Sequence, residues 1–457
     1  MEYMVSYRME RDSMGEMSVP RDSLYGAQTA RAIENFPISS LRFPRSFLKA
    51  LALIKAMAAR VNGRIGALPK GKAAAMESAA FAVAEGKYDD QFVLDVFQTG
   101  SGTSTNMNAN EVIGRLANAN PNDDVNRGQS SNDVIPTALN LAAIAEITGV
   151  LLPAMQTLVL TLSDKASEFD QIVKIGRTHL QDAVPMRLGQ EFGGYARQVE
   201  LAGERIVAAL AGMYELPMGG TAVGTGLNAP SGFASALIVE LADYTKQPLR
   251  EASNHFEAQA ARDAAVFLSA SLRNYAVALT KIANDLRWLA SGPRAGLGEI
   301  SIPATQPGSS MMPGKTNPVI AESVLMVCAQ VIGHDSAIAW CGASGNFEMN
   351  AMMPLIASNL LDSIELLAAT TVNFELRMVR GVTANEEHLE EVVEHSLAMV
   401  TALVPVIGYG PAAEIAQRAS VEGRTIRSVA EESSGLSQDE LEHLLDPSQQ
   451  STDLAKQ

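Results

Sequence analysis

The chain carries its densest group of chemically useful side chains in one loop, PGSSMMPGKTNP at 307 to 318. Gly308 and Gly314 allow a close approach of the backbone to a ligand, and the prolines around them exclude helix and strand. Lys315 and Asn317 supply hydrogen-bond donors that suit a carboxylate. The loop therefore predicts a lid that closes over a small acidic metabolite. An ordinary surface loop with polar tips is the alternative.

Four further polar segments interrupt an otherwise apolar chain. Each precedes or joins a predicted helix, where free backbone N–H groups favour bound anions. Taken singly, each is also a normal N-cap or turn. Together with the Lys315 loop, they predict one shared oxyanion site. The four segments are TGSGTSTN at 99 to 106, QSSND at 129 to 133, GRTHLQD at 176 to 182 and GGTAVGTGLN at 219 to 228.

Composition favours a mainly all-α fold. Hydrophobic residues make up 47% of the 457 residues and aromatic residues only 5%, so the interior is filled by aliphatic side chains and by 20 methionines. That profile is typical of close-packed helices. The formal net charge of -16 disfavours a nucleic-acid partner or an anionic membrane. An anionic substrate must then be attracted by a local site.

Two cysteines and the N-terminal residues indicate the compartment. Cys328 and Cys341 lie in apolar helical patterns and are expected in the core, which favours a reducing environment. The first dozen residues hold several charges and no apolar stretch, so we expect a cytoplasmic protein. The longest uncharged run, 396 to 413, contains two prolines and two glycines. We interpret it as a buried helix end and turn, and expect no membrane partner.

Long helices must position the polar segments. Helical periodicity with few breakers predicts a central bundle of five helices, each burying its apolar stripe against the others. Helices of about thirty residues are roughly 45 Å long, so one subunit cannot cover the bundle on all sides. Association of subunits is the expected consequence, and it would bring loops of different chains together. The five segments are 134 to 168, 186 to 215, 254 to 290, 318 to 340 and 348 to 376.

Shifts in composition predict three domains. Residues 1–133 combine shorter helices with the turn-rich polar segments, and 134–378 hold the bundle. Residues 379–457 are acidic helical segments followed by a polar tail, which predicts a small C-terminal helical domain.

The polar segments, in this order, resemble the fumarase/aspartase superfamily, and within it the class II fumarases. The resemblance spans nearly the whole chain, because RDSMGEMSVP at 11 to 20 and ENFPIS at 34 to 39 also match. The GSS loop alone recurs in argininosuccinate and adenylosuccinate lyases, whereas all five segments in order are specific to the superfamily. The matching segments are GSGTSTNMN at 100 to 108, QSSND at 129 to 133, GRTHLQDAVP at 176 to 185, GGTAVGTGLN at 219 to 228 and GSSMMPGKTNP at 308 to 318.

The resemblance implies a homotetramer of mainly helical, three-domain subunits, with a long central five-helix bundle and active sites each built from three chains. It implies a reversible trans addition of water to fumarate, giving L-malate through a carbanion stabilised as an aci-carboxylate. It implies no metal and no organic cofactor, and the sequence shows no metal-ligand spacing.

The resemblance also assigns roles. Ser309 would be the base, deprotonated in a dry loop beside Lys315 and backbone N–H groups. Lys315 and Asn317 would stabilise the aci-carboxylate. His179 would bind and activate the water, oriented by Glu322. A loop-capping serine and a favourable charge in the first turn of a helix are the alternatives for Ser309 and Glu322.

The predicted substrate-binding residues come from four of the segments. Where the family has His-Pro-Asn-Asp at a secondary dicarboxylate site, this chain has Asn120, Pro121, Asn122 and Asp123, which puts that site in doubt. The predicted substrate-binding residues are Ser101, Gly102, Thr103, Ser130, Ser131, Asn132, Thr178, Ser310, Lys315, Thr316 and Asn317.

Other activities share these residues. Aspartate ammonia-lyase, which eliminates ammonia from L-aspartate, is the nearest alternative, since HLQDAVPM at 179 to 186 and NPVIAE at 317 to 322 also occur in aspartase-like chains. A lyase for nucleotide or argininosuccinate substrates would need room for a bulky leaving group. A non-catalytic oligomeric protein, as in lens crystallins, is a further alternative, and retention of His179 and Ser309 argues against it.

Overall fold

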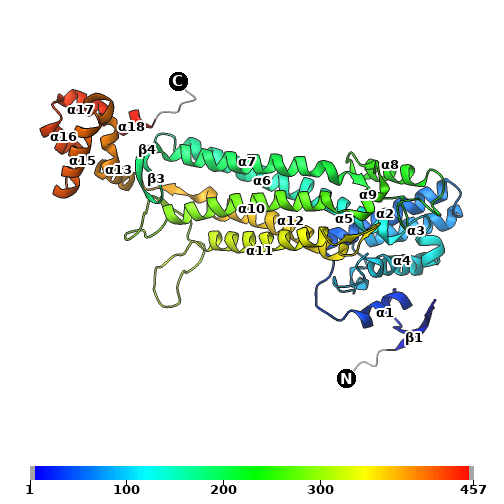
Figure 1. The fold of residues 1–457 in the computed structure, drawn as a ribbon. Coiled ribbons are helices and arrows are strands. Elements are labelled where there is room, and N and C mark those ends of the chain that lie inside the picture. Colours follow the sequence, from blue (N-terminus) through cyan, green and yellow to red (C-terminus); the bar gives the residue numbers. More distant parts are fainter. Residues whose placement is uncertain (1–5, 452–457) are drawn as a thin grey trace. The chain divides into compact units, whose positions relative to one another are not determined.

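The structure, a computed structural model, describes residues 6–451, which are mainly helical (Figure 1). It divides into two compact units. The first unit comprises 6–153, 202–277 and 327–369, and the second comprises 154–201, 278–326 and 370–451. Helices dominate both, and the described strands form five two-stranded sheets. The mainly all-α fold is therefore confirmed. Four long helices contribute to both units: α7 (Leu188–Met213), α10 (Asp263–Leu289), α11 (Val319–Gly342) and α12 (Met353–Arg377).

The first unit contains the N-terminal hairpin and most of the shorter helices. Its strands are β1 (Tyr7–Asp12), β2 (Gly15–Pro20), β5 (Glu215–Leu216), β6 (Arg250–Glu251), β8 (Gly345–Asn346) and β9 (Met349–Asn350). Its helices are α1 (Ala27–Asn35), α2 (Arg45–Arg64), α3 (Lys70–Ala84), α4 (Thr103–Ala117), α5 (Ser131–Glu146), α8 (Phe233–Thr245) and α9 (His255–Ala260), with the short turns η1 (Asp89–Gln91), η2 (Pro121–Val125) and η3 (Ile147–Leu151).

Helix α2 is the centre of the first unit. It packs against α3, α5 and α8 (Figure 1). Its apolar residues Leu51, Ile54 and Met57 are fully buried. A helix that is apolar on nearly every side must be covered on nearly every side. The same helix buries Lys55, the one charged side chain on its inner surface.

The second unit contains the β3–β4 hairpin and the C-terminal helices. Its strands are β3 (Val173–Thr178), β4 (Gln181–Arg187), β7 (Ile300–Ser301) and β10 (Thr383–Ala384). Its helices are α6 (Leu152–Glu168), α13 (Glu386–His395), α14 (Val404–Ile407), α15 (Tyr409–Glu422), α16 (Ile426–Ser433), α17 (Gln438–Leu444) and α18 (Pro447–Gln450), with the turns η4 (Val379–Gly381) and η5 (Leu397–Leu403).

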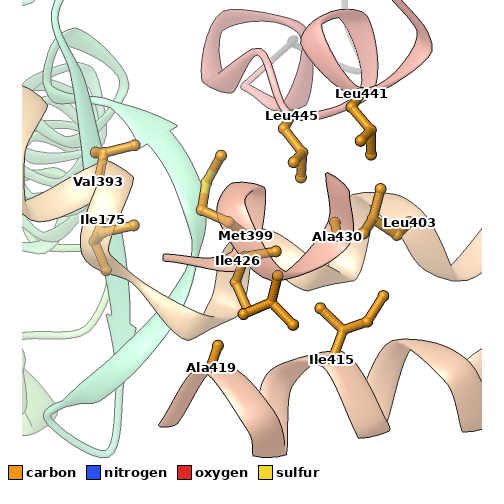
Figure 2. Packing of buried hydrophobic residues seen from close by; sticks show 11 residues of the cluster. Ile175, Val393, Met399, Leu403, Ile415, Ala419, Ile426, Ala430, Leu441 and Leu445 are labelled. Atoms are coloured by element: carbon orange, nitrogen blue, oxygen red, sulfur yellow. The ribbon is translucent and has the colours of Figure 1, made fainter. Parts of the chain in front are cut away.

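A hydrophobic cluster ties the hairpin to the C-terminal helices. Ile175 of β3 lies beside Val393 of α13 and Met399 of η5, and α15, α16 and α17 complete the cluster (Figure 2). Each fully buried aliphatic side chain contributes roughly 1.5–3 kcal/mol. The strand that leads to His179 is thus anchored by burial of Ile175.

The five predicted long helices are all present, with two differences. The run predicted at 254 to 290 is two helices, because Ala261 is extended (φ -92°, ψ 155°) between α9 and α10. The run predicted at 348 to 376 begins only at Met353, after the β8–β9 hairpin. Cys328 and Cys341 are buried and free, as expected.

Two predictions remain open. The domain boundaries predicted at 133/134 and 378/379 fall in the first turn of α5 and directly before η4, and the three-domain division stays a prediction. Three helical segments are long and apolar enough to cross a membrane by length and composition: Ser131–Glu168, Val319–Gly342 and Met353–Gly381. The expected absence of a membrane partner therefore also stays a prediction.

Candidate active site

The segment 100 to 106 forms a turn that only glycine permits. Gly102 has φ +73° and is the N-cap residue of α4. A Cβ on Gly100 would lie 1.8 Å from the carbonyl oxygen of Ala351. This turn brings the hydroxyls of Ser101 and Thr103 within 2.7 Å of each other. Two adjacent hydroxyls at a helix N-terminus form a small donor group suited to a carboxylate.

The segment 129 to 133 begins α5 with a capping box. The Ser130 hydroxyl accepts from the Asn132 N–H (3.2 Å), and the Asp133 carboxylate accepts from the Ser130 N–H (2.9 Å). Asp133 also accepts from the N–H groups of Gly219 (3.1 Å) and Thr221 (2.9 Å). Burial raises the pKa of Asp133 to about 6, although the three N–H donors oppose that shift.

Side-chain hydrogen bonds join three of the five predicted segments in the first unit. Asn132 Nδ2 donates to the Ala222 carbonyl at 2.7 Å, which fixes the 219 to 228 loop against the start of α5. Asn106 Nδ2 donates to Ser131 Oγ at 3.1 Å, which fixes α4 against it. The predicted residues Ser101, Gly102, Thr103, Ser130, Ser131 and Asn132 therefore belong to one cluster, which we call the serine-asparagine cluster.

His179 lies at the tip of a two-residue β-turn. In the β3–β4 hairpin Thr178 pairs with Gln181, and His179 and Leu180 both have positive φ (57° and 61°). This is the backbone of a type I′ turn. Thr178 and His179 are exposed, and within residues 6–451 the imidazole makes no hydrogen bond or ion pair. The ring is therefore free to meet a group outside this chain.

Buried charges hold the base of that hairpin. Lys174, 2% exposed, pairs with Glu191 (3.1 Å) and with Glu299 (3.3 Å). Arg177 pairs with Glu299 at 2.5 Å. Two cations and two anions balance, and this pairing lowers the free-energy cost of removing the charges from water. Glu299 directly precedes β7, from which the Ser309 loop departs.

The Ser309 loop is closed by its own hydrogen bonds. The Gly308 N–H donates to the Lys315 carbonyl (2.8 Å), and Asn317 Nδ2 donates to the Gly308 carbonyl (2.6 Å). A Cβ on Gly308 would lie 2.5 Å from the Lys315 oxygen, so this approach requires glycine. The two ends of the loop, 308 and 315 to 317, are thereby held together.

The geometry around Ser309 favours an anionic oxygen. Ser309 Oγ accepts from the N–H groups of Met311 (3.2 Å) and Met312 (3.0 Å). These two contacts form a serine turn, and backbone N–H groups in this position would also stabilise negative charge on the oxygen. The nearby Lys315 ammonium is exposed and unpaired among the described residues. The role of Ser309 as base stays a prediction.

The remaining predicted residues of the second unit are exposed. Ser310 and Thr316 lie on the loop, and Glu322 lies in the first turn of α11. No hydrogen bond within residues 6–451 joins Glu322 to His179, so their predicted pairing stays a prediction.

Asn120 acts as an N-cap in the predicted secondary site. Its Oδ1 accepts from the N–H groups of Asn122 and Asp123, both at 2.9 Å. Asn120, Pro121 and Asn122 also line a cavity of about 800 Å³ in which Arg8 and Arg115 are found. Binding of a dicarboxylate at this secondary site stays a prediction.

Several buried residues of the site had not been assigned a role from sequence. Asn106 lies in the TGSGTSTN segment, and the spacing of Asn106, Asn108 and Asn110 along an apolar helix is the sequence pattern that marks it. Lys55 was signalled by one charge in the apolar run LALIKAMAA. No sequence pattern marks Glu299 as part of the site. Within residues 6–451 no group of three or more His, Cys, Asp or Glu side chains is arranged to hold a metal ion.

Two family models match the chain. The model described as Lyase matches 15–333, and the model described as Fumarase C C-terminus matches 399–449. The first covers more than half of the chain and includes every predicted site residue.

The chain is similar to curated enzymes named fumarate hydratase class II. The enzyme of Corynebacterium efficiens is 52% identical over 427 residues, which are 92% of this chain and 90% of the relative. That of Xylella fastidiosa is 50% identical over 447 residues, 96% and 94% of the two chains. Among solved structures, the class II fumarase of Schistosoma mansoni is 39% identical with a TM-score of 0.94, and covers 97% of this chain and 99% of its own.

Proposed function

The chain belongs to the class II fumarate hydratase family, and we propose that it interconverts fumarate and L-malate with Ser309 as base, in sites that subunits of a homotetramer assemble. Membership makes it a lyase acting on a small dicarboxylate. The roles of individual residues and the oligomeric state are the proposed part.

Proton removal from malate is the harder step. The proton lies on the carbon beside a carboxylate, so the negative charge of the carbanion moves onto a group that is already ionised. We assign removal to Ser309, because its oxygen already accepts two backbone N–H groups. This cradle is the single structural observation that carries the proposal.

Lys315 and Asn317 are assigned to the aci-carboxylate. The Lys315 ammonium is unpaired among the described residues, and Asn317 Nδ2 uses only one of its hydrogens on Gly308. A fixed cation and a fixed amide near the developing charge need no reorganisation during the reaction. Ser310 and Thr316 flank them and are assigned to the same substrate carboxylate.

His179 is assigned to the leaving water. Imidazole titrates near neutral pH and can protonate the departing hydroxyl or, in the other direction, take a proton from water. Its exposed position at a hairpin tip, with Thr178 beside it, suits a group that reaches into a site on another subunit. Glu322 is assigned as the carboxylate that orients it.

The serine-asparagine cluster is assigned to the second substrate carboxylate. It contains hydroxyl, amide and backbone donors at the N-termini of α4 and α5, where the helix dipoles also favour an anion. The chain's net charge of -16 makes such local donors necessary.

Self-association is supported by exposed apolar side chains. Met326 and Trp340 of α11 are 69% and 75% exposed, and Phe347 of the β8–β9 turn is 92% exposed. Large apolar side chains in this number are typical of a surface that another subunit covers. We propose a cytoplasmic homotetramer whose subunits contribute the serine-asparagine cluster, the His179 hairpin and the Ser309 loop to shared sites.

The substrate assay is direct. The purified protein is incubated with L-malate and, separately, with L-aspartate, and fumarate is followed by its absorbance. Fumarate from malate alone supports the proposal. Fumarate from aspartate alone would replace it with an ammonia-lyase.

A further inference from the structure

A buried polar cluster lies beneath Ser131 in the first unit. Lys55, Asn106, Asn110 and Gln129 are all less than 10% exposed, and Asn126 completes the cluster. Each of them hydrogen-bonds to another member, and one of them reaches Ser131. Because amides donate at one end and accept at the other, the cluster has a direction that can be followed atom by atom.

The direction starts at Gln129. Its Nε2 donates to the carbonyls of Val125 (3.1 Å) and Arg127 (3.3 Å), which can only accept. Gln129 Oε1 must then face the other way, where it accepts from Lys55 Nζ at 2.9 Å. The two carbonyls can only accept, so they fix the orientation of this amide, and the contact with Lys55 agrees with it.

Asn126 is fixed in the same manner. Its Nδ2 donates to the Gln129 carbonyl at 3.1 Å, so its Oδ1 is the acceptor at the centre of the cluster. That oxygen receives Lys55 Nζ (3.3 Å) and Asn110 Nδ2 (3.1 Å). Any further group that meets it has to be a donor.

The further group is Asn106. Its Nδ2 lies 3.2 Å from Asn126 Oδ1 and 3.1 Å from Ser131 Oγ, and its two hydrogens serve these two oxygens. Asn106 Oδ1 is buried and has no partner among the described residues. A reversed amide would place that oxygen against Asn126 Oδ1, so the cluster keeps the orientation despite the unsatisfied atom.

Ser131 is therefore an acceptor toward the protein interior. Its hydroxyl accepts from Asn106, and within residues 6–451 its own hydrogen finds no acceptor. A hydroxyl in this state has its proton free for a ligand.

We propose that Asn106 is a positioning residue that fixes the direction of the Ser131 hydroxyl, so that Ser131 donates its proton to the substrate carboxylate. The inference rests on the proposed function, because it needs a carboxylate at the serine-asparagine cluster. Lys55 and Asn126 act behind Asn106 by fixing its amide.

The physical gain is a hydroxyl whose hydrogen cannot point toward Asn106, because the Asn106 N–H occupies that direction. A carboxylate only accepts hydrogen bonds, and a hydroxyl that is free to rotate can present its lone pairs instead. A hydrogen bond to a charged group is stronger than one between neutral groups. If the Ser131 hydroxyl points the wrong way, substrate binding should therefore weaken.

The test exchanges the donor for an acceptor. In Asn106→Asp the new carboxylate accepts from Ser131 and turns its proton inward. We expect KM for fumarate to rise about ten- to a hundredfold, the value of one hydrogen bond to a charged group. Asn106→Ala, which leaves the hydroxyl free to rotate, should give a smaller rise.

Asn110→Asp is the matched control. Asn110 lies one turn further along α4, donates to the same Asn126 oxygen and does not contact Ser131. It introduces the same buried charge into the same cluster, so its KM should change far less than that of Asn106→Asp. Equal effects of the two variants would overturn the inference.

A double-mutant cycle isolates the pair. In a Ser131→Ala background, Asn106→Asp and Asn106→Ala should add little to KM, because the hydroxyl they act on is gone. Full additivity would contradict the inference, and the Ala variant keeps the cycle usable if the Asp variant does not fold. An unmodified protein that does not hydrate fumarate would refute the proposed function instead.

Discussion

Arg177 and Glu299 connect the two segments of the second unit that carry the proposed catalytic residues His179 and Ser309. The guanidinium of Arg177, two residues before His179, lies 2.5 Å from the Glu299 carboxylate, which directly precedes β7 and the Ser309 loop. Lys174 joins the same carboxylate from inside the hairpin. The base of the His179 hairpin and the base of the loop are thus one buried ionic structure.

Glu299→Gln should destabilise the protein. It leaves the buried Lys174 and the partly buried Arg177 with Glu191 as their only anion among the described residues, and breaking such a network costs about 3–5 kcal/mol. The free energy of unfolding by urea and the melting temperature measure the loss. Glu432→Gln removes an exposed partner of Arg418 and Arg424 and should have no measurable effect. Equal stability of the two variants would contradict the role of Glu299.

Ser309→Ala should abolish turnover without unfolding the protein. Loss of a positioned base lowers kcat about 10²- to 10⁴-fold. Met311→Leu keeps the backbone N–H that donates to Ser309 and should retain activity, which controls for disturbance of the loop. Circular dichroism reports folding. Near-normal turnover in folded Ser309→Ala would remove Ser309 from the mechanism.

Gly102→Ala should impair the serine-asparagine cluster. The position has φ +73°, and the added Cβ would lie 2.9 Å from Ile135. A strained backbone position costs about 1–3 kcal/mol. Gly71→Ala lies in α3 with open space around it and should stabilise the protein by about 0.5–1 kcal/mol. We expect the melting temperature to fall in Gly102→Ala and to rise in Gly71→Ala. A higher melting temperature of Gly102→Ala would contradict this prediction.

Lys55 should make the free energy of unfolding depend on pH in the alkaline range. Burial lowers its pKa from 10.5 to about 7, while the Asp133 carboxylate opposes the shift. Between these two values the unfolded chain binds the proton and the folded chain does not, so stability rises with pH. Relative to Lys55→Met, the free energy of unfolding should increase by about 1 kcal/mol per pH unit from pH 7.5 to 9. If the free energy of unfolding changed with pH in the same way in both proteins, Lys55 would keep its proton in the folded chain.

The helices of this protein can be predicted from the periodicity of apolar residues, whereas its turns depend on contacts made in the folded chain. Helix α7 was predicted within two residues at either end, but the break at Ala261 was not, because AQAARDAA contains no breaker. The β3–β4 hairpin was not predicted either. Its turn, His179-Leu180, lacks the glycine or asparagine that normally marks positive φ.

The candidate site divides in the same way. Motifs predicted Ser101, Ser131 and Ser309, whose surroundings in the structure suit their proposed roles. The supporting residues Asn106 and Glu299 were not predicted, because their roles depend on partners far away in sequence. A single sequence carries residue types, and long-range pairing appears only in the folded chain.

Mixing two inactive variants tests the central claim, that His179 and Ser309 of one active site come from different subunits. His179→Ala and Ser309→Ala proteins are denatured together, refolded and assayed for fumarate formation from L-malate. In hybrid oligomers about a quarter of the sites should contain both intact residues, and activity should return in that proportion. If the mixture stays as inactive as each variant refolded alone, although hybrids have formed, the shared site is refuted.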